Sequence, residues 1–101
     1  MFRSGIENLI STKMIKTKLT ILNKAGLHAR AAAKMVSLSA RYASKIQIGK
    51  DKLVDGKSIL SLMMLEASQG TILNLQVDGD DEDEVVQALK ELVDNLFDEE
   101  E

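Results

Sequence analysis

Alternation of apolar and polar side chains along the chain predicts four short β-strands. These segments lie at residues 14–21, 45–48, 53–54 and 72–78. Ile72 is the one apolar residue out of phase in the last of them. Residues 49–52 have the composition of a hairpin turn, and residues 23–26 have that of a turn. Strands that are apolar on one side only are typical of a sheet with one covered face.

Three further segments have apolar residues at helical spacing and are predicted to be helices. They lie at residues 29–42, 58–67 and 81–96. The stripe of the first helix consists mostly of small side chains: Ala32, Met35, Val36, Ser39, Ala40 and Ala43. The last helix has the clearest stripe: Val85, Val86, Leu89, Leu92, Val93 and Leu96. Asp81 can cap this last helix, and Glu84 three residues later completes a start that resembles a capping box.

The order of these elements is β-α-β-β-α-β-α, which predicts an α+β fold. We expect a two-layer open-faced sandwich, in which a four-stranded antiparallel sheet is covered by three helices on one face. Residues 14–97 form this domain. Residues 1–13 stand apart as an N-terminal extension, which is a natural segment, the product of an upstream start codon, or an added segment, and residues 98–101 form an acidic tail. We expect the tail to be a solvated, frayed end.

The composition fits one aliphatic core without disulfides. The chain has 101 residues and is 45% hydrophobic, which suits one domain but not two. Its three aromatic residues leave the core to Ile, Leu, Val, Met and Ala. Cysteine is absent, which excludes disulfides and thiolate metal sites. No apolar stretch approaches the roughly 20 residues that cross a bilayer, and the N-terminus does not read as a secretion signal, so we expect no membrane insertion and a cytoplasmic protein.

The charge argues against nucleic acid as a partner. The formal net charge is −3, and much of the acid lies at residues 78–84 and 98–101. Proteins that bind nucleic acid usually present a basic patch together with stacking aromatic side chains. Neither feature is prominent in this sequence.

The only histidine, His28, stands where the first predicted helix begins. The first N–H groups of a helix lack internal partners, and the helix dipole places positive potential there, so this end can bind a phosphate. Arg30 adds a guanidinium that can bind two phosphate oxygens. Gly26 and Leu27, in a tight turn, would keep the imidazole exposed, and imidazole can accept a phosphoryl group near neutral pH. The sequence therefore predicts a site for transient phosphorylation of His28.

Simpler roles fit a lone histidine as well. At a helix start it can be a cap or an ordinary surface residue. A metal site is a weaker hypothesis, because no second histidine or cysteine is present to share the ion. A serine hydrolase is also disfavoured, because the chain has no nucleophile-elbow sequence.

Three motifs make the chain resemble a known family. The sequence GLHAR at residues 26–30, followed by a helix of small residues, is similar to the active-site motif of HPr. HPr is the phosphocarrier of the bacterial phosphoenolpyruvate-dependent sugar phosphotransferase system. The sequence GKSILSLM at residues 56–63 resembles the regulatory-serine segment of that family, and QGT at 69–71 falls where the family turns into its fourth strand. The resemblance covers residues 14–97, and the predicted order of elements matches the family fold.

The resemblance implies a phosphoryl carrier that needs no cofactor or metal. Enzyme I, charged by phosphoenolpyruvate, would phosphorylate His28 on Nδ1. His28 would then pass the group to a IIA-type protein. Arg30 would steady the phosphate together with the backbone N–H groups of Ala29, Arg30 and Ala31. Such a carrier is not an enzyme in the strict sense, although it can be classed with transferases.

Ala31 is a departure from the family pattern, which usually has proline after the arginine. Proline at a helix start fixes φ and has no N–H to donate. Alanine restores one donor and gives up that restraint, at a cost to stability of under about 1 kcal/mol. We expect acceptor chemistry to survive the change, while transfer rate and partner preference stay open.

Ser58 directly precedes the second predicted helix, so its plain role is an N-cap. The resemblance adds that HPr kinase/phosphorylase modifies this serine in many bacteria. A phosphate there would suit the helix start but would add about two negative charges close to the partner surface, and so would hinder docking of enzyme I.

The second helix has more apolar residues than one buried face can take. We expect Ile59, Leu62 and Leu65 to pack into the core. Leu60 and Met63 are the candidates for a partner surface, because an exposed apolar patch usually marks a contact and methionine suits several partners. Lys34 and Lys57 could provide its basic rim.

Two functions remain open at this point. The leading one is the phosphoryl carrier, which the presence of both His28 and Arg30 favours. The alternative is a regulatory binding module that keeps the fold and docks to a transcription factor or metabolic enzyme with little or no phosphoryl transfer, and Ala31 keeps it open. We expect a monomer, because a carrier must visit two partners through one face.

Overall fold

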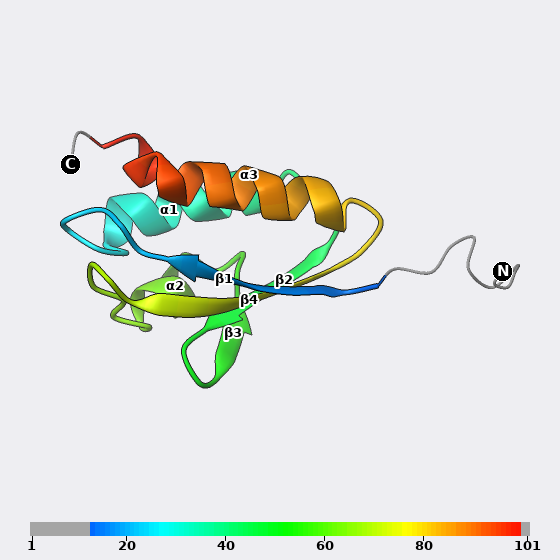
Figure 1. Ribbon diagram of the computed structural model, residues 1–101, viewed down its shortest axis with the longest axis horizontal. Helices are drawn as coiled ribbons and strands as arrows, with labels where there is room; N and C mark the ends of the chain where they lie inside the picture. The colour runs from blue at the N-terminus through cyan, green and yellow to red at the C-terminus, as the bar shows by residue number, and fades with distance from the viewer. Residues whose placement is uncertain (1–12, 100–101) are drawn as a thin grey trace, which may run out of the picture.

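One antiparallel sheet, with strands in the order β1-β4-β2-β3, forms the base of the molecule in the computed structural model (Figure 1). The elements in chain order are β1 (Ile15–Thr20), α1 (Ala29–Ser39), β2 (Lys45–Gly49), β3 (Leu53–Asp55), α2 (Ile59–Met63), β4 (Ile72–Asp78), α3 (Glu82–Asp94) and a last short turn (Leu96–Asp98). The predicted α+β open-faced sandwich, with three helices on one face of the sheet, is confirmed. The structure describes residues 13–99, so most of the predicted extension at 1–13 and the last two residues of the acidic tail lie outside the described part.

The register of the sheet explains the alternating pattern of the sequence. In the central strand β4, Val77 lies opposite Ile15 of β1 on one side and Ile46 of β2 on the other. Residues opposite each other in a sheet share a face, so these three side chains all point toward the helices. Ile72 points the other way and is 58% exposed, as its phase predicted.

The core between sheet and helices is built from aliphatic side chains, as the composition predicted. Helix α3 contributes three fully buried residues, Val85, Leu89 and Val93. Phe97, in the turn after α3, is fully buried as well and is the one aromatic side chain in the buried core of the described part. It packs where α3 ends over the start of α1, so the core closes near His28.

Helix α1 is shorter than predicted. It ends at Ser39, and the chain continues to Tyr42 with hydrogen bonds between residues three apart, from Arg41 N to Leu38 O and from Tyr42 N to Ser39 O. A tightened last turn of this kind satisfies carbonyl groups that a helix end leaves free. The predicted stripe is correct at Ala32, Met35 and Ser39, half-buried at Val36, and wrong at Ala40 and Ala43, which are exposed because the helix has already ended.

Helix α2 is also shorter than predicted and ends at Met63. Glu66 adopts a positive φ of 52°, which turns the chain away before Ala67. Of the three residues expected in the core, Leu62 is fully buried and Leu65 packs against the core, but Ile59 is 41% exposed. The prediction for Ile59 was wrong because α2 has only five residues, and the one side of this short helix that faces the core is occupied by Leu62.

The predicted cap of α3 is wrong in its detail. Asp81 stands at the N-cap position, but its side chain makes no capping bond. Its carboxylate accepts hydrogen bonds from the backbone N–H groups of Ala43 (2.9 Å) and Ser44 (3.1 Å) and from the Ser44 hydroxyl. The carboxylate that reaches back over the helix start is that of Glu82, which accepts a hydrogen bond from the N–H of Gly79 at 3.0 Å. Asp81 therefore ties the segment before β2 to the start of α3.

Candidate functional site

The loop before α1 is fixed by a close approach of two backbones. Gly26 has a positive φ of 73°, and a Cβ there would lie 2.6 Å from the carbonyl oxygen of Ala67. The same oxygen accepts a hydrogen bond from the N–H of Leu27 at 2.8 Å, and Leu27 is buried. Glycine is needed at this position because a side chain would occupy the space of the facing backbone. The residue before His28 is therefore held firmly in place.

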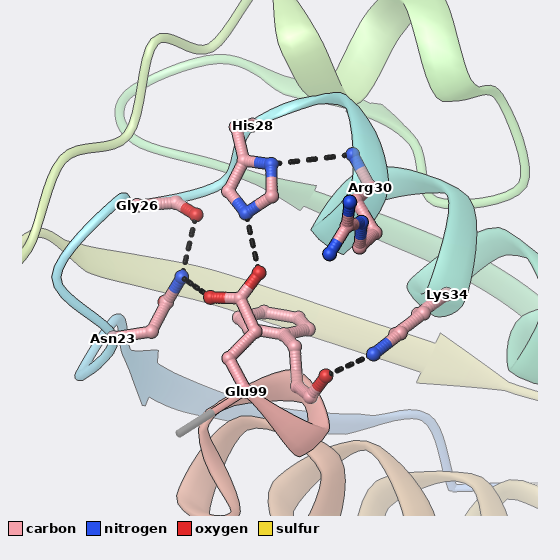
Figure 2. Close-up of polar contacts among 7 residues, drawn as sticks. Asn23, Gly26, His28, Arg30, Lys34 and Glu99 are labelled. Carbon is pink, nitrogen blue, oxygen red and sulfur yellow. Dashed lines mark hydrogen bonds and ion pairs between the residues drawn. The ribbon is translucent and has the colours of Figure 1, made fainter. Parts of the chain in front are cut away.

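His28 is the N-cap residue of α1, as predicted. Its backbone is extended, with φ −81° and ψ −178°, and its Nδ1 accepts a hydrogen bond from the N–H of Arg30 at 3.3 Å (Figure 2). The side chain is 33% exposed, so a partner can reach the ring. The imidazole thus lies at the positively polarised end of a helix of eleven residues.

The second ring nitrogen of His28 faces a carboxylate. Nε2 lies 2.6 Å from Oε2 of Glu99 (Figure 2). Nδ1 accepts from a backbone N–H, so in the neutral ring the proton belongs on Nε2, which donates it to Glu99. The Nδ1 lone pair is left pointing at the helix start.

Glu99 is a site residue that the sequence did not predict. We expected the acidic tail to be solvated, but the Glu99 side chain is only 18% exposed, and that prediction was wrong for this residue. Besides His28, its carboxylate accepts from Nδ2 of Asn23 at 3.1 Å. Asn23 is fully buried, and its Nδ2 also donates to the carbonyl of Gly26 at 2.8 Å. The hydrogen bond from His28, supported by that from Asn23, holds the pKa of the Glu99 carboxyl below its usual value.

The turn after α3 brings Glu99 to this position. Leu96, Phe97 and Asp98 have positive φ values of 59°, 54° and 63°. Left-handed backbone costs roughly 1–2 kcal/mol per residue, so other contacts must outweigh it. The buried ring of Phe97 is one such contact, and Lys34 Nζ donates to the Phe97 carbonyl at 2.6 Å (Figure 2).

The other predicted phosphate ligands lie at the same helix start. Ala29, Arg30 and Ala31 are the first three residues of α1, where N–H groups lack carbonyl partners within the helix. The Arg30 side chain is exposed, and its guanidinium makes no hydrogen bond or ion pair within residues 13–99. Ala31 is fully buried, so the residue that departs from the family pattern packs into the core through its methyl group. Among the described residues, no group of three or more His, Cys, Asp or Glu side chains could hold a metal ion.

The two lysines predicted at a partner surface make contacts inside the fold. Lys34 Nζ donates to Phe97, as described, and Lys57 Nζ donates to the carbonyl of Tyr42 at 2.8 Å. Both lysines are half-buried. Each therefore has a structural role, and a role at a partner surface stays a prediction.

Ser58 and the α2 surface lie beside α1. Ser58 is the N-cap of α2, and its hydroxyl accepts from the N–H of Ser61 at 3.2 Å. The contact of Lys57 with the end of α1, and that of Ala67 with its start, show that α2 runs antiparallel to α1. The exposed residues Ile59, Leu60, Met63 and Met64, which we call the α2 patch, are 41%, 68%, 39% and 73% exposed. The C-terminal end of this patch is the end nearer to His28.

The uncovered face of the sheet has a different character. A hollow of about 320 Å³ on this face is lined by residues of β1, β4 and the β2–β3 hairpin, among them Lys16, Asn74 and Leu53. None of its lining residues belongs to the cluster around His28. No helix in the described part is long and apolar enough to span a bilayer.

Comparisons with known proteins agree with this geometry. The sequence profile of the family described as "PTS HPr component phosphorylation site" matches residues 15–95. The phosphocarrier protein HPr of Pseudomonas aeruginosa is 51% identical over 84 residues, which are 81% of this chain and 93% of that protein. The structure of HPr-C-His from Thermoanaerobacter tengcongensis superposes with a TM-score of 0.82 at 42% identity, covering 86% of this chain and 99% of that one. An HPr dimer from the same organism gives a TM-score of 0.68 at 44% identity, over 80% of this chain and 94% of that one.

Proposed function

The chain belongs to the HPr family and is a phosphoryl carrier of the phosphotransferase system, and on that premise we propose that His28 is the residue that accepts and donates the phosphoryl group. The observation that supports this most strongly is the orientation of the ring. Nδ1 faces the N-terminus of α1 with its lone pair free of a proton, while Nε2 is bound to Glu99. A nucleophilic nitrogen beside a helix N-terminus can attack a phosphoryl group while the N–H groups of the helix bind its oxygens.

The transfer exchanges one bond to phosphorus for another. The lone pair of Nδ1 attacks the phosphorus atom, an Nδ1–P bond forms, and the bond between phosphorus and the donor breaks, with its electron pair staying on the donor. The N–H of Arg30, which contacts Nδ1 in the free protein, is then available to a phosphoryl oxygen. The same steps in reverse pass the group to the next acceptor.

Arg30 and the backbone of the helix start stabilise the transferred group. The free guanidinium of Arg30 can bind two phosphoryl oxygens, which a point charge does less well. The N–H groups of Ala29 and Ala31 complete the binding set. Because Ala31 has an N–H where proline has none, this chain has one more potential donor at the helix start than the usual family pattern.

As a member of its family the chain works with other proteins of the phosphotransferase system. In our proposal, enzyme I is the donor, a IIA-type protein is the acceptor, and both dock on the α2 patch beside His28. Leu60 and Met63 are central to this surface, and the exposed Met64 extends it toward His28. Flexible methionine side chains suit a surface that must fit two different partners.

Ser58 is proposed as a regulatory phosphorylation site for an HPr kinase/phosphorylase. It lies near the end of α1, because its neighbour Lys57 contacts Tyr42 there, so the length of α1 separates it from His28. That length is roughly 16 Å at 1.5 Å per residue, beyond the Debye length of about 8–10 Å. A phosphate on Ser58 would therefore act on docking at the α2 patch rather than on His28 itself.

The regulatory binding module rests on Ala31 alone, and the arrangement around His28 does not favour it over the carrier. A docking module does not need an accessible imidazole with an oriented nitrogen or a free arginine beside it. Because its proposed phosphoryl donor is charged from phosphoenolpyruvate, we propose that the protein acts in the cytoplasm. The monomer expected from two partners sharing one face is a prediction that sedimentation would test, especially since one of the related structures is a dimer.

Phosphorylation of the purified chain tests the proposal. The protein is incubated with phosphoenolpyruvate and a cognate enzyme I, and its intact mass is measured before and after mild acid. We expect one acid-labile phosphate on the wild type and none on His28→Ala. A phosphate retained by His28→Ala, or none on the wild type while enzyme I charges another HPr, would refute His28 as the acceptor.

A further inference from the structure

The imidazole of His28 has two nitrogens, and the structure gives each a different neighbour. Nδ1 contacts the backbone N–H of Arg30, and Nε2 contacts the carboxylate of Glu99 at 2.6 Å. The first neighbour belongs to the predicted site. The second comes from a segment 71 residues away along the chain, and the transfer described so far does not use it.

We propose that Glu99 is a positioning residue for phosphoryl transfer, because it holds the Nε2 proton and so presents Nδ1 as the nucleophile. The proposal rests on His28 as the acceptor and adds a second partner to it. A neutral imidazole has one proton for two nitrogens, and a ring free in solution populates both forms. The N–H of Arg30 at Nδ1 and the carboxylate of Glu99 at Nε2 both favour the form with a lone pair on Nδ1, and the Glu99 contact, at 2.6 Å against 3.3 Å, is the shorter of the two and the one that carries a charge.

The charge of Glu99 contributes to the transfer as well. When Nδ1 bonds to phosphorus its lone pair is used, and the ring, which keeps its Nε2 proton, becomes positively charged. The carboxylate of Glu99 then faces a cation instead of a neutral ring, and a hydrogen bond between opposite charges is stronger than one with a neutral partner. Among the residues drawn in Figure 2, Arg30 and Lys34, both on α1, are the other charged groups near this pair.

Besides His28, one further hydrogen bond fixes the Glu99 carboxylate, and two contacts of Phe97 hold the turn that precedes it. Its second oxygen accepts from Asn23, which is fully buried and anchored to the Gly26 carbonyl. The preceding turn is held by the buried Phe97 ring and by the bond from Lys34 to the Phe97 carbonyl. A surface glutamate has no such anchors, and three consecutive left-handed residues are not adopted without compensation.

Two variants separate the charge of Glu99 from its ability to accept a hydrogen bond. Glu99→Gln keeps an acceptor oxygen and loses the charge, and Glu99→Ala loses both. Glu91→Ala, an exposed glutamate on α3, is the matched control. The forms of the neutral His28 ring are read from the 15N chemical shifts of its two nitrogens, and transfer rates from single-turnover phosphorylation by enzyme I. Thermal unfolding of each variant shows that the fold is intact.

We expect a neutral ring with its proton on Nε2 in the wild type, in Glu91→Ala and in Glu99→Gln, and a mixture of both forms in Glu99→Ala. Transfer should slow by roughly ten-fold in Glu99→Ala, as for the loss of one charged hydrogen bond. It should slow by less in Glu99→Gln and stay unchanged in Glu91→Ala.

Two results would overturn the proposal: wild-type rates in both Glu99 variants, or a ring in Glu99→Ala that still has its proton on Nε2. His28→Ala is measured in the same series. A phosphate on His28→Ala would mean that the acceptor itself is wrong. An inactive His28→Ala beside fully active Glu99 variants would mean that the acceptor is right and Glu99 plays no part.

Discussion

Replacing Gly26 with alanine tests whether the close approach before His28 requires glycine. Gly26 and Gly70 are the two glycines with positive φ in the described part, at 73° and 91°. A Cβ at Gly26 would lie 2.6 Å from the oxygen of Ala67 and 3.0 Å from Cα of Ser68, whereas a Cβ at Gly70 meets nothing within 4 Å. Gly70→Ala is therefore a matched control that has the backbone strain without the collision.

The magnitudes follow from these two environments. Both substitutions place a non-glycine residue in left-handed backbone, at about 1–2 kcal/mol each. Both also restrict the unfolded chain, which offsets this by about 0.4–1 kcal/mol. Gly26→Ala must in addition push the Ala67 carbonyl away, and this weakens its hydrogen bond with Leu27, worth about 0.5–1.5 kcal/mol. The free energy of unfolding should therefore be lower in Gly26→Ala than in Gly70→Ala by roughly 1 kcal/mol or more.

Urea unfolding followed by circular dichroism measures this difference. With a slope of about 2 kcal/mol per molar urea, the midpoint of Gly26→Ala should lie roughly 0.5 M below that of Gly70→Ala. Since Leu27 directly precedes His28, Gly26→Ala should also transfer the phosphoryl group more slowly than Gly70→Ala. Equal midpoints in the two variants would show that the contact with Ala67 does not require glycine, and the argument for a fixed loop before His28 would fail.

Two further substitutions test other parts of the structure. The hydrogen bonds from the Ser44 hydroxyl and the Ala43 N–H lower the pKa of Asp81 in the folded protein. The carboxylate therefore stabilises the fold at pH values above the usual pKa of about 3.9. This stabilisation is lost as the pH falls through the lower pKa of the folded state. Asp81→Asn should thus be less stable than the wild type at pH 7, and the gap between their urea midpoints should close below about pH 4; a gap that does not depend on pH would contradict this reasoning. Leu60→Ser should weaken binding to enzyme I in a titration, whereas Ile72→Ser, which changes an exposed apolar residue on the uncovered sheet face, should bind as the wild type does. Neither substitution should change the stability of the fold. Equal binding by Leu60→Ser and wild type would remove the α2 patch as the docking surface.

The strands and α3 could be predicted from the sequence because their pattern is local. In β4 the alternation of buried and exposed residues follows directly from the pleat, and even the exposure of Ile72 was evident from its phase. Val85, Leu89 and Val93 repeat at helical spacing for the same reason. For each of these residues, the pattern of its neighbours along the chain indicates which way its side chain points.

The ends of the helices could not be predicted, because contacts from other segments set them. No helix-stopping residue stands near Ser39 in the sequence. The chain turns there toward Ser44, which is bound by Asp81, 37 residues further along the chain. Asp81 has the right spacing for a helix cap, but its carboxylate binds the N–H groups of Ala43 and Ser44 and the Ser44 hydroxyl rather than the N–H groups of α3. The helix-capping preference of a residue does not indicate whether donors from another segment will bind its side chain.

His28 and Arg30 of the candidate site could be predicted from the sequence, but Glu99 could not. His28 and Arg30 lie on one short stretch whose composition indicates a helix start, and the structure places both there. Glu99 lies 71 residues from His28 in an acidic segment whose composition is typical of a solvated end. Its place depends on the burial of Phe97 and on the left-handed turn, and neither leaves a periodic signal in the sequence.

The position of Glu99 also decides how the protein can be labelled or immobilised. β1 begins at one end of the molecule, whereas α1 begins at the opposite end, where the last described residues also lie (Figure 1). A dye, a resin linkage or a fused domain attached after Glu99 would emerge beside the imidazole and crowd any visiting protein. The same group attached ahead of β1 would leave the docking end of the molecule open.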